Sequence, residues 1–380
     1  MVKKPSRRRT TSKTSSAPTA EIVPAINKKK RELVYGFFER ILRHSKGGKA
    51  GQPFLLLPWQ KKVLADVFAR VKPDGSRQFR TAYIELPKKQ GKSTTLAGVA
   101  LYGLVCDNEP GAEIYGAASD REQAGIIYRE AASMVRASPS LSKRLEVIDS
   151  RKTIVDRQTN SFYRVLSADA FRAEGLNIHM LLFDELHAQR DRRLWDALRY
   201  GGAARRQPLI LSITTAGYDR RSICWEQHAY AEKCIADPAF DPTFYGCIYA
   251  ASPDCATDGT WKTPAVWKQA NPSLGETITL ESFKADAREA EQSPSKLNSF
   301  LRYRGCAPRP KGWGAQPEDG STSGPRKTRG GSPRRHGLRV PISCGHLATV
   351  RSMPGSTSRA RTISPPWCSS APTRTTTRST

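Results

Sequence analysis

The sequence predicts an α/β fold in which a mostly parallel sheet is covered by helices on both faces. Two observations lead to this class. Apolar runs of strand length alternate with segments of helical spacing between residues 53 and 217. The strands expected at 179–185 and 207–217 are built around the apolar stretches MLLF and LIL, as buried strands are. A chain of 380 residues is long enough for two or three domains.

The first half of the chain supplies the following elements in order. Helical spacing is found at 31–48 and from Pro58 to residue 71. A strand at 81–86, a loop and a buried helix at 93–106 come next. They are followed by a second strand at 112–119 and a helix at 120–137. This alternation is typical of strands joined by helical crossovers.

The second half continues the alternation and then departs from it. Residues 152–168 alternate like a hairpin, and the two apolar strands are separated by a helix at 191–202. After residue 218 we expect a helix at 221–237, a strand at 244–250 and a short helix at 263–272. Residues 279–304 are helical around Pro294, and after Arg304 the periodic signals stop.

Both ends of the chain are basic and of low complexity. The segment 1–31 contains ten lysines and arginines and one acid, whereas the segment 305–380 contains thirteen and two. These ends carry most of the net charge of +27, which favours polyanions such as nucleic acid. The alternative is that they are simply solvated. We expect residues 1–30 and 305–380 to be disordered tails, because they cannot bury enough apolar surface to offset the entropy of ordering.

The cysteines and the apolar segments indicate the compartment. The eight cysteines contain no C-x-x-C pair, so zinc spacing is absent and free thiols in a reducing cytosol are expected. No apolar run approaches the roughly 20 residues that span a bilayer, and the N-terminus lacks the apolar part of a secretory signal. We therefore expect a cytoplasmic protein with no membrane contact.

The stretch IELPKKQGKSTTLAG (84–98) contains the end of a phosphate-binding loop between a strand and a helix. Gly91 permits close backbone approach to an anion, Lys92 is expected on the β- and γ-phosphates of ATP, and Ser93 on Mg²⁺. Leu86 replaces the usual first glycine, so a chance GKS in a basic turn is the alternative. Lysines at the positive end of a helix are unfavourable unless an anion binds there. The residues expected around the nucleotide are Lys88, Lys89, Gln90, Gly91, Lys92, Ser93 and Thr94.

Two acids follow the apolar strand MLLF. In parallel sheets strand ends meet at one crevice, so Asp184 and Glu185 are expected near Lys92. Asp184 would hold Mg²⁺ through water, and Glu185 would polarise the attacking water. The alternative is a strand end that leads into solvent. The combination with the lysine loop favours the catalytic interpretation.

Other residues are weaker candidates for the same site. Thr214 and Thr215 end the next strand and are candidates to sense the γ-phosphate. Arg172 lies in a glycine-containing loop and is a candidate to neutralise transition-state charge, although a solvated surface arginine fits equally well. Gln60 is a candidate to read an adenine edge, whereas Trp59 beside it is expected in the core.

Four segments together resemble the large subunit of a tailed-phage terminase, the motor that packages DNA. They are LPWQKKVL, the altered loop LPKKQGKST, the acid strand LLFDELHA and the coupling strand SITTAG, and the resemblance extends from about residue 35 to residue 304. It implies a P-loop NTPase core of the ASCE or RecA-like type at 31–218, completed at 219–304 with a helical linker region.

The resemblance also implies a function and partners. ATP hydrolysis would move double-stranded viral DNA into a procapsid. The subunits would work as a homo-oligomeric ring on the portal, with a terminase small subunit. The family's RNase H-like nuclease should begin soon after residue 304, but residues 305–380 contain only the acids Glu318 and Asp319. The abrupt change suggests a shifted reading frame and a truncated prophage product, from which we expect no endonuclease activity.

Three other functions fit part of these features. A helicase or another P-loop DNA translocase would share the ATPase core but needs a second ATPase lobe. A non-enzymatic DNA-binding protein would use the basic ends, with steep salt dependence and no response to ATP. A folded fragment without a function is the third.

Overall fold

The structure, a computed structural model, describes residues 23–118, 121–166, 175–189, 191–217 and 219–305. These residues all belong to one compact unit within Met1–Lys311. Most of the two predicted tails lies outside the described residues. The expected disorder of residues 1–30 is wrong for the last of them, because helix α1 (Lys28–Gly36) begins there and the Asn27 side chain caps it by accepting a hydrogen bond from the Lys30 amide. None of the described helices is long and apolar enough to cross a bilayer.

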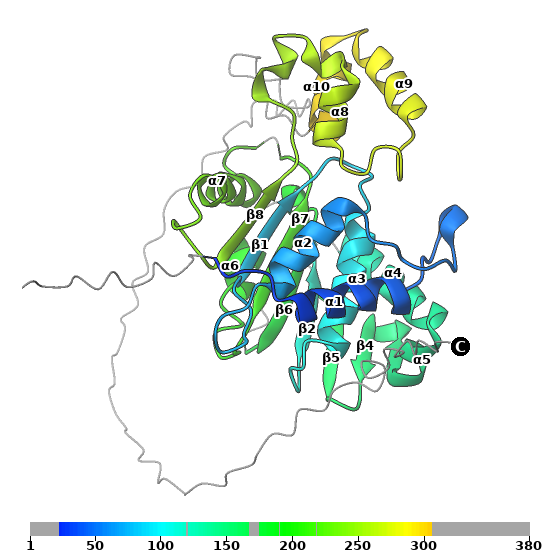
Figure 1. Ribbon diagram of the computed structural model, residues 1–380, viewed down its shortest axis with the longest axis vertical. Helices are drawn as coiled ribbons and strands as arrows, with labels where there is room; N and C mark the ends of the chain where they lie inside the picture. The colour runs from blue at the N-terminus through cyan, green and yellow to red at the C-terminus, as the bar shows by residue number, and fades with distance from the viewer. Residues whose placement is uncertain (1–22, 119–120, 167–174, 190, 218, 306–380) are drawn as a thin grey trace, which may run out of the picture. The chain divides into compact units, whose positions relative to one another are not determined.

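An eight-stranded sheet forms the centre of this unit, in the order β3-β4-β5-β2-β6-β7-β1-β8 (Figure 1). Pairing is parallel from β5 to β8 and antiparallel at β3–β4 and β4–β5, which confirms the mostly parallel sheet. The predicted hairpin is β4–β5. The strands are β1 (Thr81–Glu85), β2 (Glu113–Ala117), β3 (Leu145–Ile148), β4 (Thr153–Asp156), β5 (Ser161–Val165), β6 (Ile178–Asp184), β7 (Leu209–Thr214) and β8 (Phe244–Ile248).

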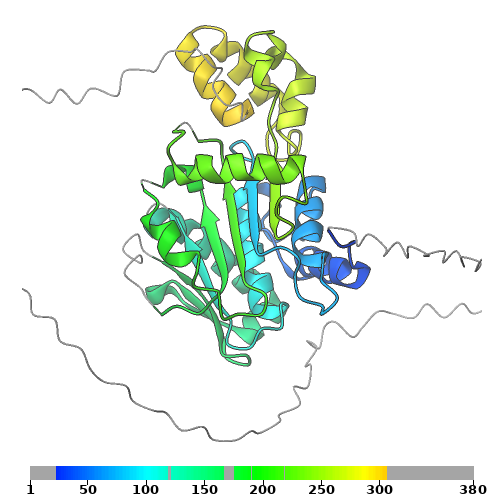
Figure 2. The same cartoon turned by 90° about the vertical axis from the view of Figure 1, so that its left-hand side faces the viewer.

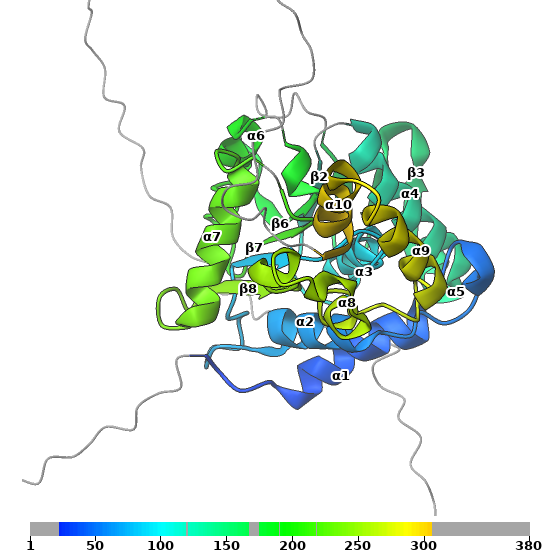
Figure 3. The same cartoon turned by 90° about the horizontal axis from the view of Figure 1, so that it is seen from above.

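Helices cover both faces of the sheet, as predicted (Figures 1 and 3). Helices α6 (Arg193–Leu198) and α7 (Ile223–Ala236) lie on one face, where the rings of Phe183 and Trp195 are 5.2 Å apart. The other face carries α1, α2 (Pro58–Ala69), α3 (Lys92–Val105) and α4 (Arg121–Ala137), with the short α5 (Pro139–Arg144) after α4. On that face α3 lies close to the turn Phe37–Ile41 that follows α1. A Cβ on Gly98 of α3 would lie 2.4 Å from a ring carbon of Phe38 in this turn.

A second, smaller core lies in residues 251–301. It is formed by α8 (Pro264–Ala270), α9 (Leu280–Ala290) and α10 (Pro294–Phe300), and Figure 2 shows these helices beyond one end of the strands. The ring of Phe283 lies 5.0 Å from that of Trp267 and 5.4 Å from that of Phe300. The chain then makes one π-helical turn, Leu301–Gly305.

Two local predictions differ from the structure. The helix expected at 31–48 ends with a π-helical turn at Phe37–Ile41. Leu42 is extended and its carbonyl accepts a hydrogen bond from the amide of Phe54, so pairing with a distant segment replaces the last helical turns. Strand β3 was not predicted, because its stability comes from pairing with β4 at the sheet edge and its own residues show little alternation.

The sheet order decides where the predicted site residues lie. Strands β1 and β6 both pair with β7 in parallel, with Glu85 opposite Thr214 and Asp184 opposite Ile213. The carboxyl ends of β1, β6 and β7 therefore lie on the same side of the sheet. The loop after β1, the acids at the end of β6 and the threonines at the end of β7 all emerge there.

Candidate functional site

The loop Leu86–Gly91 connects β1 to α3 and is the candidate anion cradle. Gly91 immediately precedes α3 with φ of 84°, a left-handed conformation that favours glycine. Lys89 also has a positive φ, 67°. Leu86 is fully buried, and its amide donates a 2.9 Å hydrogen bond to the carbonyl of Thr214. The residue at the usual glycine position thus continues the strand pairing, which explains why a leucine fits there.

The ammonium of Lys92 lies where the loop after β1 meets the ends of β6 and β7. It is 5% exposed and donates to the carbonyls of Leu86 and Pro87 at 3.1 and 3.2 Å. It also donates to the Thr215 hydroxyl and lies 3.6 Å from Oε1 of Glu185. The predicted proximity of Lys92 to Glu185 is therefore present in the structure.

Ser93 and Asp184 form the second contact between loop and acid strand. The Ser93 hydroxyl donates to Oδ2 of Asp184 at 2.8 Å, while Oδ1 of the same carboxylate is buried without a hydrogen-bond partner. Burial and the neighbouring charge of Glu185 raise the pKa of Asp184 to about 6, although the Ser93 hydroxyl and Lys92 oppose the shift. A buried, unpartnered carboxylate oxygen beside a hydroxyl fits a hard divalent cation.

The described residues contain no cluster of three or more His, Cys, Asp or Glu side chains suited to a metal ion. Mg²⁺ does not need one, because it usually takes one or two carboxylates together with water and the phosphates of a nucleotide. The donor set of Ser93 and Asp184 is therefore sufficient for a magnesium–nucleotide complex but not for a metal site made by the protein alone.

Glu185 occupies a strained position just after β6. Its φ is 51°, in the left-handed region that non-glycine residues seldom adopt, and such strain is found preferentially at functional sites. Burial would raise its pKa, but the hydrogen bond from His187 and the charge of Lys92 lower the pKa to about 2. Nδ1 of His187 lies 3.0 Å from Oε2 of Glu185. Glu185 is thus held as a carboxylate.

The two threonines at the end of β7 join the same network. Both are fully buried. The Thr215 hydroxyl, which accepts from Lys92, lies 3.3 Å from Oε2 of Glu185. The Thr214 hydroxyl accepts a 3.1 Å hydrogen bond from the amide of His187. These contacts connect β7 to the loop lysine and to the acid strand.

The two predicted glutamines have different surroundings. Oε1 of Gln60 accepts from the amide of Leu57 and its Nε2 donates to Thr95 Oγ1, both at 2.8 Å, so it links α2 to the first turn of α3. The side chain of Gln90 is fully buried and faces away from the cradle, donating to Asn271 at 3.0 Å and accepting from the amide of Ser273 at 2.9 Å. Gln90 was expected to contact the nucleotide, but only its backbone is left for such a contact.

The remaining predicted residues differ in exposure. Lys89 is exposed, and its carbonyl accepts from the hydroxyl of Thr277. Thr94 is half-buried in the first turn of α3, and Lys88 is half-buried beside Tyr303. Arg172 lies outside the described residues.

Sequence reasoning missed three groups around this site. His187 comes soon after Glu185, and a search for polar partners near the acids would have found it. A buried pair, Glu85 and His228, lies at the end of β1, with Nδ1 of His228 2.9 Å from Glu85 Oε2. Tyr303 is far from Lys88 along the chain, so no local signal could have indicated it.

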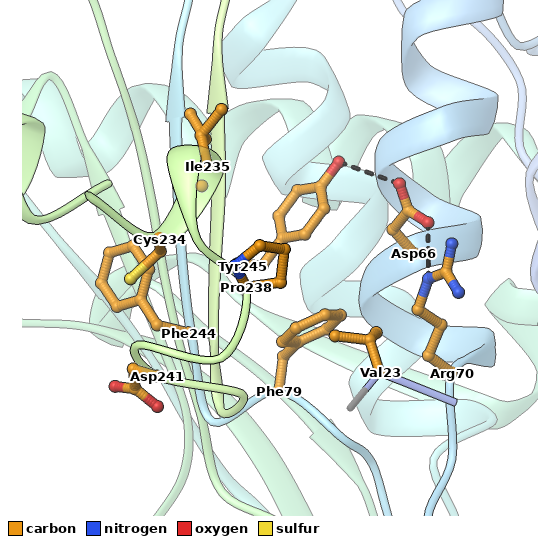
Figure 4. Close-up of a pocket in the computed structure, with 11 residues that line it drawn as sticks. Val23, Asp66, Arg70, Phe79, Cys234, Ile235, Pro238, Asp241, Phe244 and Tyr245 are labelled. Atoms are coloured by element: carbon orange, nitrogen blue, oxygen red, sulfur yellow. Dashed lines mark hydrogen bonds and ion pairs between the residues drawn. The ribbon is translucent and has the colours of Figure 1, made fainter. Parts of the chain in front are cut away.

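A separate cavity of about 340 Å³ lies at the amino ends of β1 and β8, at the other end of the strands from the loop (Figure 4). Asp66 is in its wall and accepts from the hydroxyl of Tyr245 at 3.2 Å and from Nε of Arg70 at 2.8 Å. These polar groups pair with one another, and none of the predicted site residues lines the cavity.

A strand, a Gly-Lys-Ser loop, a helix and two acids at the end of another parallel strand of the same sheet define the P-loop NTPase class of fold. Residues 58–233 match the family model "Terminase large subunit, ATPase domain". This part of the chain is therefore similar to the ATPase domains of terminase large subunits.

The chain is also similar to two individual proteins and to one solved structure. The chain is 29% identical over 277 residues to the "Terminase, large subunit" of Enterobacteria phage HK97, covering 71% of this chain and 51% of that protein. It is 28% identical over 129 residues to "Protein YmfN" of Escherichia coli strain K12, covering 34% of this chain and 28% of that protein. The crystal structure of the HK97 bacteriophage large terminase superposes with a TM-score of 0.64 at 25% identity, covering 74% of this chain and 56% of that one. The chain thus spans about half the length of the HK97 protein.

Proposed function

We propose that this chain is a Mg²⁺-dependent ATP hydrolase that drives double-stranded viral DNA into a procapsid. The observation that carries the proposal is the convergence of four side chains at the carboxyl ends of the parallel strands. They are Lys92, Ser93, Asp184 and Glu185. A lysine on the phosphates, a hydroxyl and a carboxylate for the metal, and a second carboxylate for water are the parts that phosphoryl transfer to water requires.

Binding would rest on the loop and on the start of α3. The positive end of this 14-residue helix, together with Lys92, favours the phosphates. Ser93 and Asp184 would hold Mg²⁺, which neutralises phosphate charge when bound. Gln60 keeps one amide N–H and one lone pair for an adenine edge beyond its two observed hydrogen bonds.

Hydrolysis would depend on Glu185. As a carboxylate with a low pKa it can accept a hydrogen bond from water and orient it toward the γ-phosphate. Thr215 touches both Lys92 and Glu185, which supports a role for β7 in sensing the γ-phosphate. Arg172 stays a candidate for neutralising transition-state charge.

The packaging role and its partners follow from the family resemblance. We propose double-stranded DNA as the polymer moved, a homo-oligomeric ring on the portal of the procapsid as the working assembly, and the terminase small subunit as a further partner. The basic residues at both ends favour contact with DNA, and such binding weakens steeply with salt.

The test is phosphate release by the full chain with ATP and Mg²⁺, with and without duplex DNA. Turnover that needs Mg²⁺ and rises with duplex DNA supports the proposal. Stimulation by single-stranded DNA alone would favour a helicase. Salt-sensitive DNA binding with no nucleotide turnover would leave only the basic DNA-binding function.

A further inference from the structure

The turn Leu301–Gly305 lies against the phosphate loop, although the two segments are far apart along the chain. The amide of Lys88 donates a 2.9 Å hydrogen bond to the carbonyl of Tyr303. The ammonium of the same lysine lies 3.6 Å from the centre of the Tyr303 ring. Backbone and side chain of one loop residue are thus both held by one tyrosine.

The same turn is fixed to the rest of the site. Asn271 donates from Nδ2 to the carbonyl of Arg304 at 2.6 Å and accepts from Gln90 of the loop through Oδ1. On the other side, Nε of Arg302 is 3.5 Å from the carbonyl of Ala216, next to Thr215. The turn therefore bridges the phosphate loop and the end of β7, which fixes the backbone that carries Tyr303.

The two neighbouring lysines differ in surroundings. Lys88 is half-buried against the ring, and its charge is one of those that lower the pKa of Glu185, so the ammonium lies within electrostatic range of that carboxylate. Lys89 is exposed and its carbonyl accepts from Thr277. A cation held over an aromatic face is attracted by the ring quadrupole, which limits the orientations available to a flexible lysine.

The geometry points to Tyr303 as a positioning residue that holds Lys88 ready for the terminal phosphate of a bound nucleoside triphosphate. This rests on the proposed nucleotide site. Tyr303 does not contact the phosphate; it acts through the lysine. The charge of Lys88 acts on Glu185, the residue proposed to orient water toward the γ-phosphate, so we expect it to matter for a triphosphate and much less for a diphosphate.

The test measures the dissociation constants of ATPγS and ADP, both with Mg²⁺, for variants of the full chain. Tyr303→Leu keeps the backbone carbonyl and apolar bulk but removes the ring. We expect about threefold to tenfold weaker ATPγS binding, the range of a cation–π contact, with ADP affinity within about twofold. Tyr303→Phe keeps the ring and should bind like the wild type.

A double-mutant cycle separates positioning from structural damage. Lys88→Ala should lose at least as much ATPγS affinity, and adding Tyr303→Leu to it should cost nothing further. Lys89→Ala is the matched control, and its effect should add to that of Tyr303→Leu. Additive losses for Lys88 and Tyr303, or equal losses for ADP and ATPγS, would overturn the inference.

The proposed function and this inference fail in distinguishable ways. A wild type that binds ATPγS without hydrolysing ATP removes the proposed hydrolase, while the binding cycle still decides the role of Tyr303. A wild type that binds neither nucleotide overturns both.

Discussion

The Ser93 hydroxyl donates a 2.8 Å hydrogen bond to one oxygen of Asp184, and the other oxygen of that carboxylate is buried without a partner. An unsatisfied buried acceptor is costly unless a ligand completes it. This relationship makes Asp184 the residue most directly expected to respond to a divalent cation.

Asp184→Asn should remove most of the Mg²⁺-dependent part of nucleotide binding, because the amide offers no negative charge to the cation. Binding at a hundredfold excess over Kd stabilises a protein by about 2.7 kcal/mol. Thermal unfolding with ATPγS, in Mg²⁺ and in EDTA, measures the effect. Asp191→Asn, an exposed acid, is the control. If Mg²⁺ adds as much stability to the Asp184 variant with ATPγS as it adds to the wild type, Asp184 does not hold the metal.

Glu185→Gln should keep nucleotide binding within a few-fold and lower kcat by about a hundredfold or more, the usual contribution of a positioned base. The amide is nearly the same size but cannot accept a proton from water. Steady-state phosphate release and ATPγS titration together test this, with the exposed Glu232→Gln as control. Retained turnover would assign the water-orienting role to another group.

Lys92→Ala should weaken ATP binding itself. The ammonium is buried and held by the loop carbonyls, Thr215 and Glu185, at the place where the phosphates are expected. We expect at least a tenfold rise in Kd, since charge-assisted hydrogen bonds contribute about 1.5–3 kcal/mol. The exposed Lys89→Ala is the matched control in the same loop. Equal losses in both variants would show that general positive charge, rather than this position, binds the nucleotide.

His228→Asn should change how stability depends on pH. Burial lowers the pKa of His228, but the hydrogen bond and charge of Glu85, with help from Glu232, raise the pKa above its usual value. Such a group stabilises the fold fully below the unfolded pKa, about 6.5, and the contribution is lost as pH rises through the folded pKa. Cys224 and Tyr83 are the other titratable groups in this cluster, and Trp225 stacks on the imidazole.

Urea unfolding of wild type and His228→Asn at pH 6 and pH 9 measures this. The asparagine amide can donate to Glu85 without titrating, so the advantage of the wild type should shrink at the higher pH. The other titratable groups are present in both proteins, so their contributions cancel in the difference. A constant difference between the two proteins would mean that folding leaves the pKa of His228 unchanged.

Gly98→Ala should destabilise the protein by about 1–3 kcal/mol, as overpacking of a core does. The new Cβ would lie 2.4 Å from the ring of the buried Phe38, where α3 packs against its neighbour. Gly36→Ala is the matched control, because that helical glycine has open space around its Cα and should gain up to about 1 kcal/mol. Denaturant unfolding compares the two, and stabilisation by both changes would contradict the packing argument.

Several elements and site residues were predictable because their signals are local. The apolar stretch MLLF followed by two acids predicts a buried strand with Asp184 at its tip, and the structure has that strand. The segment around Gly91 predicts a loop before a helix, and the left-handed φ of this residue supplies the reason for the glycine. Leu86 was harder to interpret, since only the pairing of its amide with Thr214 shows why glycine is not needed there.

Other features depended on partners that the sequence does not place nearby. Gln90 was expected to face a nucleotide, but its side chain is used by Asn271 and Ser273. Helix α1 was expected to continue past residue 41, but hydrogen bonds to residues 52–54 end it.

The sequence by itself determined the alternation of strands and helices and the chemical identity of the phosphate loop and the acid pair, because these depend on spacing within short segments. Tertiary structure alone decided which lysine of the loop is held and by what, which glutamine is turned away, and that His228 pairs with Glu85. Those choices arise from the packing of segments that are distant in the sequence. Packing selects among side-chain orientations that are locally equivalent in energy.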